Sequence, residues 1–76
     1  MEPIVSARIV TIDPEILGGA PVFSGTRVPI VVLFENIADG FTVQESVDAY
    51  PTLTLDVALE ALRQAAILLI QHGRVR

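Results

Sequence analysis

The stretch Gly18-Gly-Ala-Pro-Val-Phe-Ser-Gly-Thr-Arg-Val-Pro-Ile30 decides how the first half of the chain folds. Glycine or proline occupies five of its thirteen positions, and at this density the two residue types set the direction of the backbone. Pro21-Val-Phe23 has the composition of an extended segment, Ser24-Gly25 that of a turn, and Thr26-Arg-Val28 that of a returning strand. The sequence therefore predicts a tight β-hairpin over residues 22–28, with glycine at the turn because glycine accepts turn conformations without strain.

The residues before this stretch predict a strand and a single helical turn. Residues 4–12 are rich in β-branched side chains, which favour extended structure. Asp13-Pro14-Glu15 combines a capping residue, a proline and an acidic residue in the order typical of a helix start. Gly18-Gly19 is expected to end that helix after about one turn.

The residues after it predict two amphipathic helices. The first is expected to follow Pro29, which sets the backbone for a helix start, and to end at Gly40. Thr42-Val-Gln-Glu45 is a capping box, in which a hydroxyl and a carboxylate satisfy backbone donors reciprocally, so a second short helix is expected to begin there and to end at Pro51. The apolar face of the first helix, at the i, i+3, i+4 and i+7 positions, consists of Ile30, Leu33, Phe34 and Ile37.

The third predicted helix is apolar around most of its circumference. Thr54 and Asp56 start it, and we expect it to run to about Gln71 and to stop at Gly73. A helix of this kind needs cover on most sides, and the two other helices of so small a domain can cover only part of it. We therefore expect its second half, Ala65–Ile70, to contact another chain; the alternative is an ordinary place in the core. The expected residues of this dimer or partner interface are Leu62, Ala66, Leu69 and Ile70.

The expected fold is mainly α with a small β part, in a single domain of 76 residues. Residues 1–28 are assigned to the β-strand and hairpin, residues 29–71 to the three helices, and residues 72–76 to a basic tail. A chain of this length buries only roughly 60% of its unfolded surface, so its core is thin.

The composition limits the ways in which such a small core can be reinforced. There is no cysteine and a single histidine, which excludes disulfides and both cysteine-based and histidine-rich metal sites, and we expect no cofactor. Hydrophobic residues make up 51% of the chain and charged residues 18%, against about 25% charged in an average domain. The remaining way to bury apolar surface is contact with another protein chain.

The charge balance and the apolar runs indicate partner and location. The formal net charge is −4, and all five cations are arginines, so the chain suits a basic protein partner better than a general polyanion. The longest apolar run, Ala65–Ile70, is far shorter than the roughly 20 residues of a membrane span. The N-terminus lacks a basic segment followed by a long apolar run, and we therefore expect a cytoplasmic protein without membrane contact.

The order of these motifs is similar to that of a bacterial family, the domain of unknown function 433 family. That family's pattern runs Asp-Pro, then a Gly-rich segment with Pro, then Gly-Thr-Arg-(Ile/Val)-Pro-Val, as residues 13–30 do here. It continues with an apolar helix ending in glycine, a Ser/Thr-led acidic helix, an aromatic-Pro pair and an Ala/Leu-rich last helix. The matching segments are Ala38-Asp-Gly40, Thr42-Val-Gln-Glu45, Ala49-Tyr-Pro51 and Ala58-Leu-Glu-Ala-Leu62. The resemblance covers about residues 4–68.

The resemblance implies a homeodomain-like helix-turn-helix fold and an antitoxin role in a type II toxin–antitoxin pair, VapB-like in function. The implied partner is a PIN-like ribonuclease toxin, which such antitoxins block, usually as dimers that also bind their own operator DNA. The ending of the last helix, Ile67-Leu-Leu-Ile70 followed by His-Gly-Arg-Val-Arg76, departs from the family pattern, so no role carries over to it. The alternative function is a stand-alone helix-turn-helix transcriptional regulator without a toxin.

Four residues are candidates for contacts with DNA: Arg27, Thr52, Thr54 and Arg63. In a helix-turn-helix the helix after the turn presents its N-terminal residues to base edges. Asp56 and Glu60 on that helix would repel the DNA backbone, and the basic stripe that binding normally needs is missing. We therefore expect operator DNA to be bound only by a dimer or a toxin complex, or else the fold serves only as a scaffold for a partner. Arg27 itself has two readings, a phosphate contact or an ion pair that holds the hairpin.

The C-terminal tail carries two candidate toxin-neutralising residues, Arg74 and Arg76. A PIN-like nuclease would have an acidic, metal-binding active site, and the guanidinium fork pairs bidentately with carboxylates. The alternative is a solvated tail without a contact. An enzyme is not expected, because His72 has no nucleophile beside it in a stable element and the Asp56–Glu60 pair reads as a solvated helix face. No small-molecule substrate is indicated.

Overall fold

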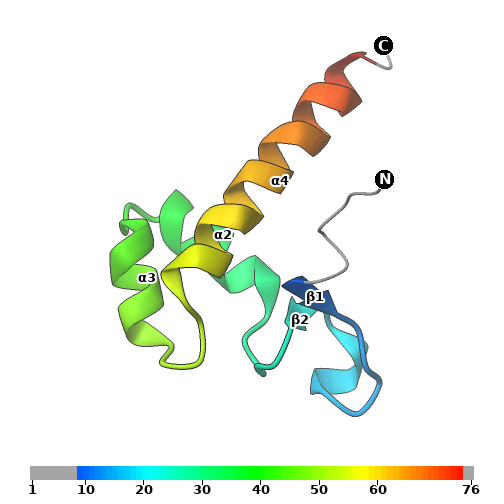
Figure 1. The fold of residues 1–76 in the computed structure, drawn as a ribbon, viewed down its shortest axis with the longest axis vertical. Coiled ribbons are helices and arrows are strands. Elements are labelled where there is room, and N and C mark those ends of the chain that lie inside the picture. Colours follow the sequence, from blue (N-terminus) through cyan, green and yellow to red (C-terminus); the bar gives the residue numbers. More distant parts are fainter. Residues whose placement is uncertain (1–8, 75–76) are drawn as a thin grey trace.

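The computed structural model describes residues 9–74 and consists of a small β part followed by three helices (Figure 1). The order of elements is β1 (Val10–Thr11), the 3₁₀ turn η1 (Leu17–Gly19), β2 (Val22–Phe23), α2 (Ile30–Ala38), α3 (Val43–Ala49) and α4 (Leu55–Arg74). The predicted fold class, mainly α with an N-terminal β element before three helices, is confirmed.

The β part is shorter than predicted, and its strands pair differently. β1 has two residues, whereas a strand was expected over residues 4–12, of which residues 4–8 lie outside the described part. β1 pairs antiparallel with β2, with Val10 opposite Phe23. Thr26–Val28 does not form the expected return strand, but the chain after the turn does meet β2: Val22 and Pro29 form an isolated antiparallel bridge, and the Phe23 N–H donates to the Val28 carbonyl at 3.0 Å. The pairing ends at Pro29, because proline has no N–H to donate to a longer ladder and α2 begins at the next residue.

The turn after β2 is built as its residue types predicted. Gly25 has a φ of 79°, in the left-handed region that glycine occupies without strain. The Thr26 hydroxyl donates to the Phe23 carbonyl at 2.7 Å and accepts from the Val28 N–H at 2.9 Å. The side chain of Thr26 therefore closes the turn, and Arg27 is left on its exposed side.

The predicted helical turn at Asp13 is instead an Asx-type turn followed by η1. The Asp13 carboxylate accepts from the Glu15 N–H at 2.9 Å, as a cap would, but the chain does not continue as an α-helix. Leu17 and Gly18 both have positive φ, 51° and 67°, which breaks helical geometry before a second turn can form.

The limits of α2 and α3 follow the capping signals. Pro29 is the N-cap of α2, and Gly40, with a φ of 101°, turns the chain after it. At the start of α3 the Glu45 N–H donates to Thr42 Oγ1 at 3.0 Å, and the Thr42 N–H donates to Glu45 Oε1 at 2.8 Å, so the capping box is confirmed. Tyr50 is the C-cap of α3, directly before the proline that was expected to end it.

The last helix is longer than expected. Thr54 lies at its start, as predicted, but Gly73 does not stop it, since α4 continues to Arg74. A helical glycine costs only about 1 kcal/mol relative to alanine, so one glycine near the end does not by itself terminate a helix.

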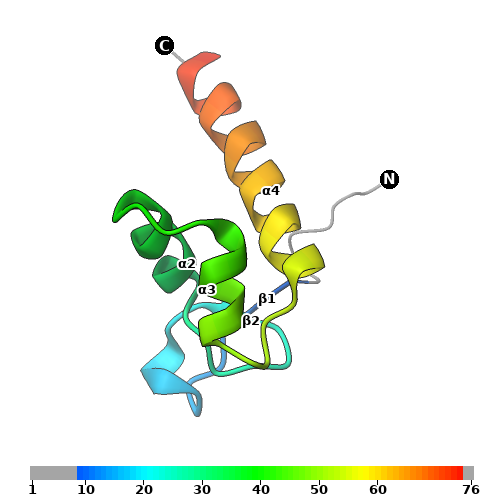
Figure 2. The same cartoon turned by 90° about the vertical axis from the view of Figure 1, so that its left-hand side faces the viewer.

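One core joins β2 and the three helices at one end of the molecule, with Val43 and Val47 of α3 half-buried against it. Its buried residues come from β2, the following turn, α2, the loop before α4 and the first turns of α4, namely Phe23, Val28, Leu33, Leu53, Ala58 and Ala61. Viewed from the side, α2, α3 and the β part form a body around the beginning of α4, and the rest of α4 projects away from it (Figure 2). The fold thus has two ends, a packed body and a free helix.

Candidate partner-binding and nucleic-acid-binding surfaces

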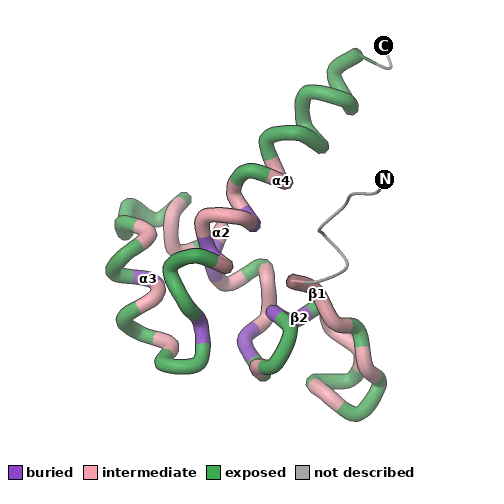
Figure 3. The backbone as a smooth tube through the Cα atoms, viewed as in Figure 1, coloured by how far each residue is buried: buried purple, intermediate pink, exposed green. Residues whose placement is uncertain are grey.

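The projecting half of α4 is an exposed apolar surface. Ile67, Leu68, Leu69 and Ile70 are 54%, 63%, 70% and 55% exposed. Two turns earlier on the same helix, Ala58 and Ala61 are 0% and 6% exposed. Figure 3 shows this change along α4 from buried and intermediate residues near the body to exposed residues beyond it. An ordinary place in the core, the alternative considered for this segment, is therefore wrong for its last four residues.

The four residues expected at an interface divide at the edge of the body. Ala66, Leu69 and Ile70 lie on the projecting part and are exposed, whereas Leu62 is half-buried where α4 leaves the body. Ile67 and Leu68 are as exposed as these and belong to the same surface; the expected segment Ala65–Ile70 includes them, although the four-residue set does not. The uninterrupted apolar run was the signal for them, because consecutive helical residues point to all sides. Contiguous exposed apolar surface of this kind marks an interaction site.

The tail ends the helix rather than following it as a separate segment. His72 and Arg74 occupy the last turn of α4, both exposed, where positive charge interacts favourably with the helix dipole. Arg74 is therefore presented on a helix at its free end. Arg76, the second residue of the predicted toxin-neutralising pair, lies outside the described residues.

The DNA candidates lie mainly at the opposite end of the molecule. Thr52 is exposed in the loop before α4, and the Thr54 hydroxyl accepts from the Val57 N–H at 3.3 Å, which assigns Thr54 to capping the helix. The turn that carries Arg27 and the loop that carries Thr52 both lie at the body end, away from the free end of α4 (Figures 1 and 2). Arg63 lies apart from them, midway along α4.

Two of these candidates are arginines with different surroundings. Arg63 Nη1 lies 3.3 Å from Glu60 Oε1, and the other Glu60 oxygen accepts from Gln64 Nε2 at 3.1 Å, so the positive charge of Arg63 is shared with an adjacent carboxylate. Arg27 forms no ion pair with any carboxylate of residues 9–74, so the alternative that an ion pair of Arg27 holds the hairpin has no support within these residues.

The charge distribution of the body is one-sided. Between Val28 and Leu62 the chain has no lysine, arginine or histidine, while six carboxylates occur there: Glu35, Asp39, Glu45, Asp48, Asp56 and Glu60. This segment includes α2, α3 and the start of α4, the elements that a helix-turn-helix would bring to DNA. Lysine and arginine side chains drive phosphate binding, so this acidic segment disfavours contact with DNA.

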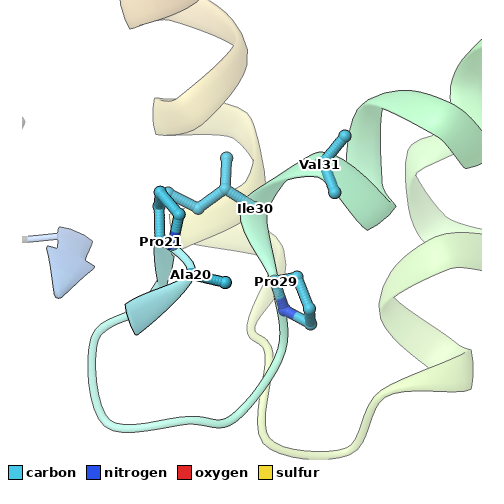
Figure 4. Close-up of a pocket in the computed structure, with 5 residues that line it drawn as sticks. All are labelled: Ala20, Pro21, Pro29, Ile30 and Val31. Carbon is cyan, nitrogen blue, oxygen red and sulfur yellow. The ribbon is translucent and has the colours of Figure 1, made fainter. Parts of the chain in front are cut away.

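A small pocket lies where the β part meets α2 (Figure 4). It measures about 270 Å³ and is lined by Ala20, Pro21, Pro29, Ile30 and Val31. The Ile30 N–H donates to the Pro21 carbonyl at 3.0 Å, which joins its two walls. All five lining residues are apolar, so the pocket lacks the polar groups that orient a substrate or a cofactor.

The part of the chain that the structure describes holds neither a candidate metal site nor a membrane-spanning helix. Within residues 9–74 no group of three or more histidine, cysteine, aspartate or glutamate side chains could hold a metal ion. No helix there combines the length and the apolar character needed to cross a bilayer, α4 with its 20 residues included.

Comparison with known proteins identifies relatives of the chain. The family model described as "Protein of unknown function (DUF433)" matches residues 10–65. A protein of Sinorhizobium fredii (strain NBRC 101917 / NGR234), described as "Uncharacterized protein y4eO", is 40% identical over 68 residues, which is 88% of this chain and 29% of that protein. The chain thus corresponds to less than a third of that relative. No solved structure matches it. The family match ends at Ala65, just where α4 becomes exposed.

Proposed function

Because this chain belongs to the DUF433 family, we propose that it is the antitoxin of a type II toxin–antitoxin pair, VapB-like in function, that binds and neutralises a PIN-like ribonuclease. The observation that carries the proposal is the projecting half of α4, whose apolar residues Ile67–Ile70 are all more than half exposed. An amphipathic helix binds a groove of another protein through its one apolar face. A helical segment that is apolar on all sides can bury more of its surface in such a groove.

Charge gives the second argument for a protein partner. The body carries six carboxylates and no cation between Val28 and Leu62, so it suits a basic protein and repels nucleic acid. The free end has the opposite sign, with His72 and Arg74 in the last turn of α4. In the proposed complex the apolar half of α4 lies in a groove of the nuclease, and Arg74, followed by Arg76, reaches the carboxylates of its active site, where the guanidinium group replaces the metal ion.

Operator binding is proposed only for the dimer or the toxin complex. Arg27 and Thr52 lie at the body end, opposite the free helix, so a toxin bound at the helix would leave them accessible. The acidic helices beside them weaken any contact that one chain makes alone, and cations of the toxin would have to supply further phosphate contacts. A stand-alone regulator would need a basic face that residues 28–62 do not contain.

Co-expression with the adjacent gene product tests the proposal. The chain carries an N-terminal tag, so that the free end of α4 stays native, and the mass and content of the purified complex are measured. We expect a stoichiometric complex with a small nuclease, whose RNA cleavage the chain inhibits. Ile67→Asp should weaken the complex at least about tenfold, because it removes a buried side chain from the groove. The matched control Ile12→Asp makes the same substitution at an exposed isoleucine outside α4 and should bind as the wild type.

Two results would count against this function. Recovery of the chain without a second protein, together with specific retention of upstream DNA by the chain alone, would establish the regulator instead. The role of the tail is tested separately: Arg74→Glu combined with Arg76→Glu should lower inhibition of the nuclease, and inhibition at wild-type potency would remove the two arginines from the mechanism.

A further inference from the structure

A regular apolar stripe runs along the whole of α4, beside its core-facing side. Its spacing alternates between four and three residues, and its members are Leu55, Leu59, Leu62, Ala66, Leu69 and Gly73. In an α-helix with 3.6 residues per turn these positions fall within about 80° of the circumference. The buried residues Ala58 and Ala61 lie roughly 60° and 120° around the helix from the centre of the stripe, so the stripe borders the surface that packs into the body and is centred outside it.

The stripe stays open to contact along its full length. Leu55, Ala66, Leu69 and Gly73 are exposed, and the body only half-buries the two leucines between Leu55 and Ala66. Alternating four- and three-residue spacing of apolar side chains is the pattern by which two helices pack knobs into holes. The partner that fits this stripe is therefore another helix with the same spacing.

We propose that the stripe pairs with the same stripe of a second copy of the chain, with the two α4 helices antiparallel. Overlap of the full helices brings Leu55 level with Gly73 of the second copy, and Leu62 level with its Ala66. A large side chain then meets a small one at both positions, which fills the layers evenly. A parallel pair would instead place alanine on alanine and glycine on glycine, and would leave voids in the seam.

The charges of α4 favour the same orientation. Its first turn carries Asp56 and its last turn carries His72 and Arg74. An antiparallel pair brings the acidic start of each helix level with the basic end of the other, and it opposes the two helix dipoles. A parallel pair brings Asp56 beside Asp56 and Arg74 beside Arg74, which is repulsive.

Pairing in this way leaves part of the projecting surface uncovered. Ile67 and Leu68 lie more than about 100° around the helix from the centre of the stripe, so the second copy does not reach them. They stay available to a different protein. The pairing does not rest on the proposed antitoxin role, because it concerns the purified chain alone, and either statement can fail without the other. A nuclease groove that takes up the whole projecting half of α4 would replace the second copy there.

Sedimentation equilibrium of the purified full chain tests the second copy. We expect twice the 8.2 kDa mass of the chain. Leu69→Asp should raise the dissociation constant on the order of 100-fold, since two symmetry-related leucine layers are lost. Leu68→Asp is the matched control, with the same change in a neighbouring leucine of similar exposure outside the stripe, and its dissociation constant should stay within about threefold of wild type. A wild-type monomer, or equal weakening by both variants, would overturn the proposal.

Disulfide trapping tests the orientation, and the chain is suited to it because it has no cysteine. The two variants are Leu55→Cys and Gly73→Cys. Both native residues are exposed, and nothing lies within 4 Å of a side chain added at Gly73. Under mild oxidation a mixture of the two variants should form a cross-linked heterodimer. Each variant alone should not cross-link, because like positions lie roughly 27 Å apart along an antiparallel pair. Cross-linking of Gly73→Cys with itself, and not in the mixture, would show a parallel pair and overturn the orientation.

Discussion

The two halves of α4 have similar side chains and opposite surroundings. Near the body, Ala58 and Ala61 are buried against β2, α2 and the loop before the helix. Past Ala65 the helix continues with residues at least as apolar, and they are exposed. An apolar helical pattern therefore predicts how much of a helix surface packs against other side chains. It does not predict whether those side chains belong to the same chain.

The family model ends at the same place. The family match ends at Ala65, so it includes the covered half of α4 and stops before the exposed half. The body is thus what this chain has in common with the family, and the projecting half is the part that the family pattern does not describe. We expect the choice of partner to depend on this half.

The largest predicted effect compares one substitution on the two halves. Ala58→Asp should destabilise the protein by about 5 kcal/mol, because it buries an unpaired charge in a full core, and a domain this small should then unfold. Ala66→Asp, two turns later, should leave the fold intact. Far-ultraviolet circular dichroism during thermal unfolding, at a protein concentration low enough to keep both variants monomeric, measures the difference. Equal losses of helix would show that the projecting half is part of the core after all.

A smaller effect is predicted for the core side chain of β2 that packs with the first half of α4. Phe23→Ala removes a side chain that is 0% exposed and packs with α4 in the core, and should cost about 3 kcal/mol. Phe41→Ala makes the same change at a side chain that is 52% exposed and should cost less than about 1 kcal/mol. Urea denaturation gives both free energies of unfolding. If the two variants are equally stable, β2 does not hold α4 in place.

The smallest predicted effect is on the helix that lies beside α4. Thr42→Ala removes the hydroxyl that accepts from the Glu45 N–H and should cost about 1 kcal/mol of unfolding free energy. Thr52→Ala serves as the control, because its side chain is exposed in a loop and makes no hydrogen bond within residues 9–74. Hydrogen exchange in α3 should quicken in the first variant only. Unchanged protection of α3 would mean that packing, and not the cap, fixes its position.

Local signals in the sequence were sufficient for most helix boundaries and for the turn after β2. The capping box fixes the start of α3, Gly40 ends α2 with a backbone angle that glycine favours, and Gly25 forms the turn after β2. Each of these depends on residues within four positions of one another, so the residue types determine them. The signals failed where they were weak: Gly73 did not end α4, and the turn at Asp13 did not become an α-helix.

The candidate surfaces were predictable in part. The apolar run after Ala65 predicted an interface; the structure shows that this run is exposed, and its contact with another chain stays a prediction. The absence of cations between Val28 and Leu62 was readable in the printed sequence. That Thr54 caps α4 and that Arg63 lies beside Glu60 depends on side-chain geometry, which residue types alone do not give.

The sequence by itself determined the three helices, the acidic body and the excess of apolar residues on the last helix, because caps, periodicity and composition act over short distances along the chain. Only the tertiary structure decided that β2 forms its ladder with β1, while the segment after the turn contributes a single bridge at Pro29, because strand pairing joins residues far apart in sequence. It also decided where along α4 the cover ends. That point depends on how far the body reaches in space, and no residue of α4 carries that information.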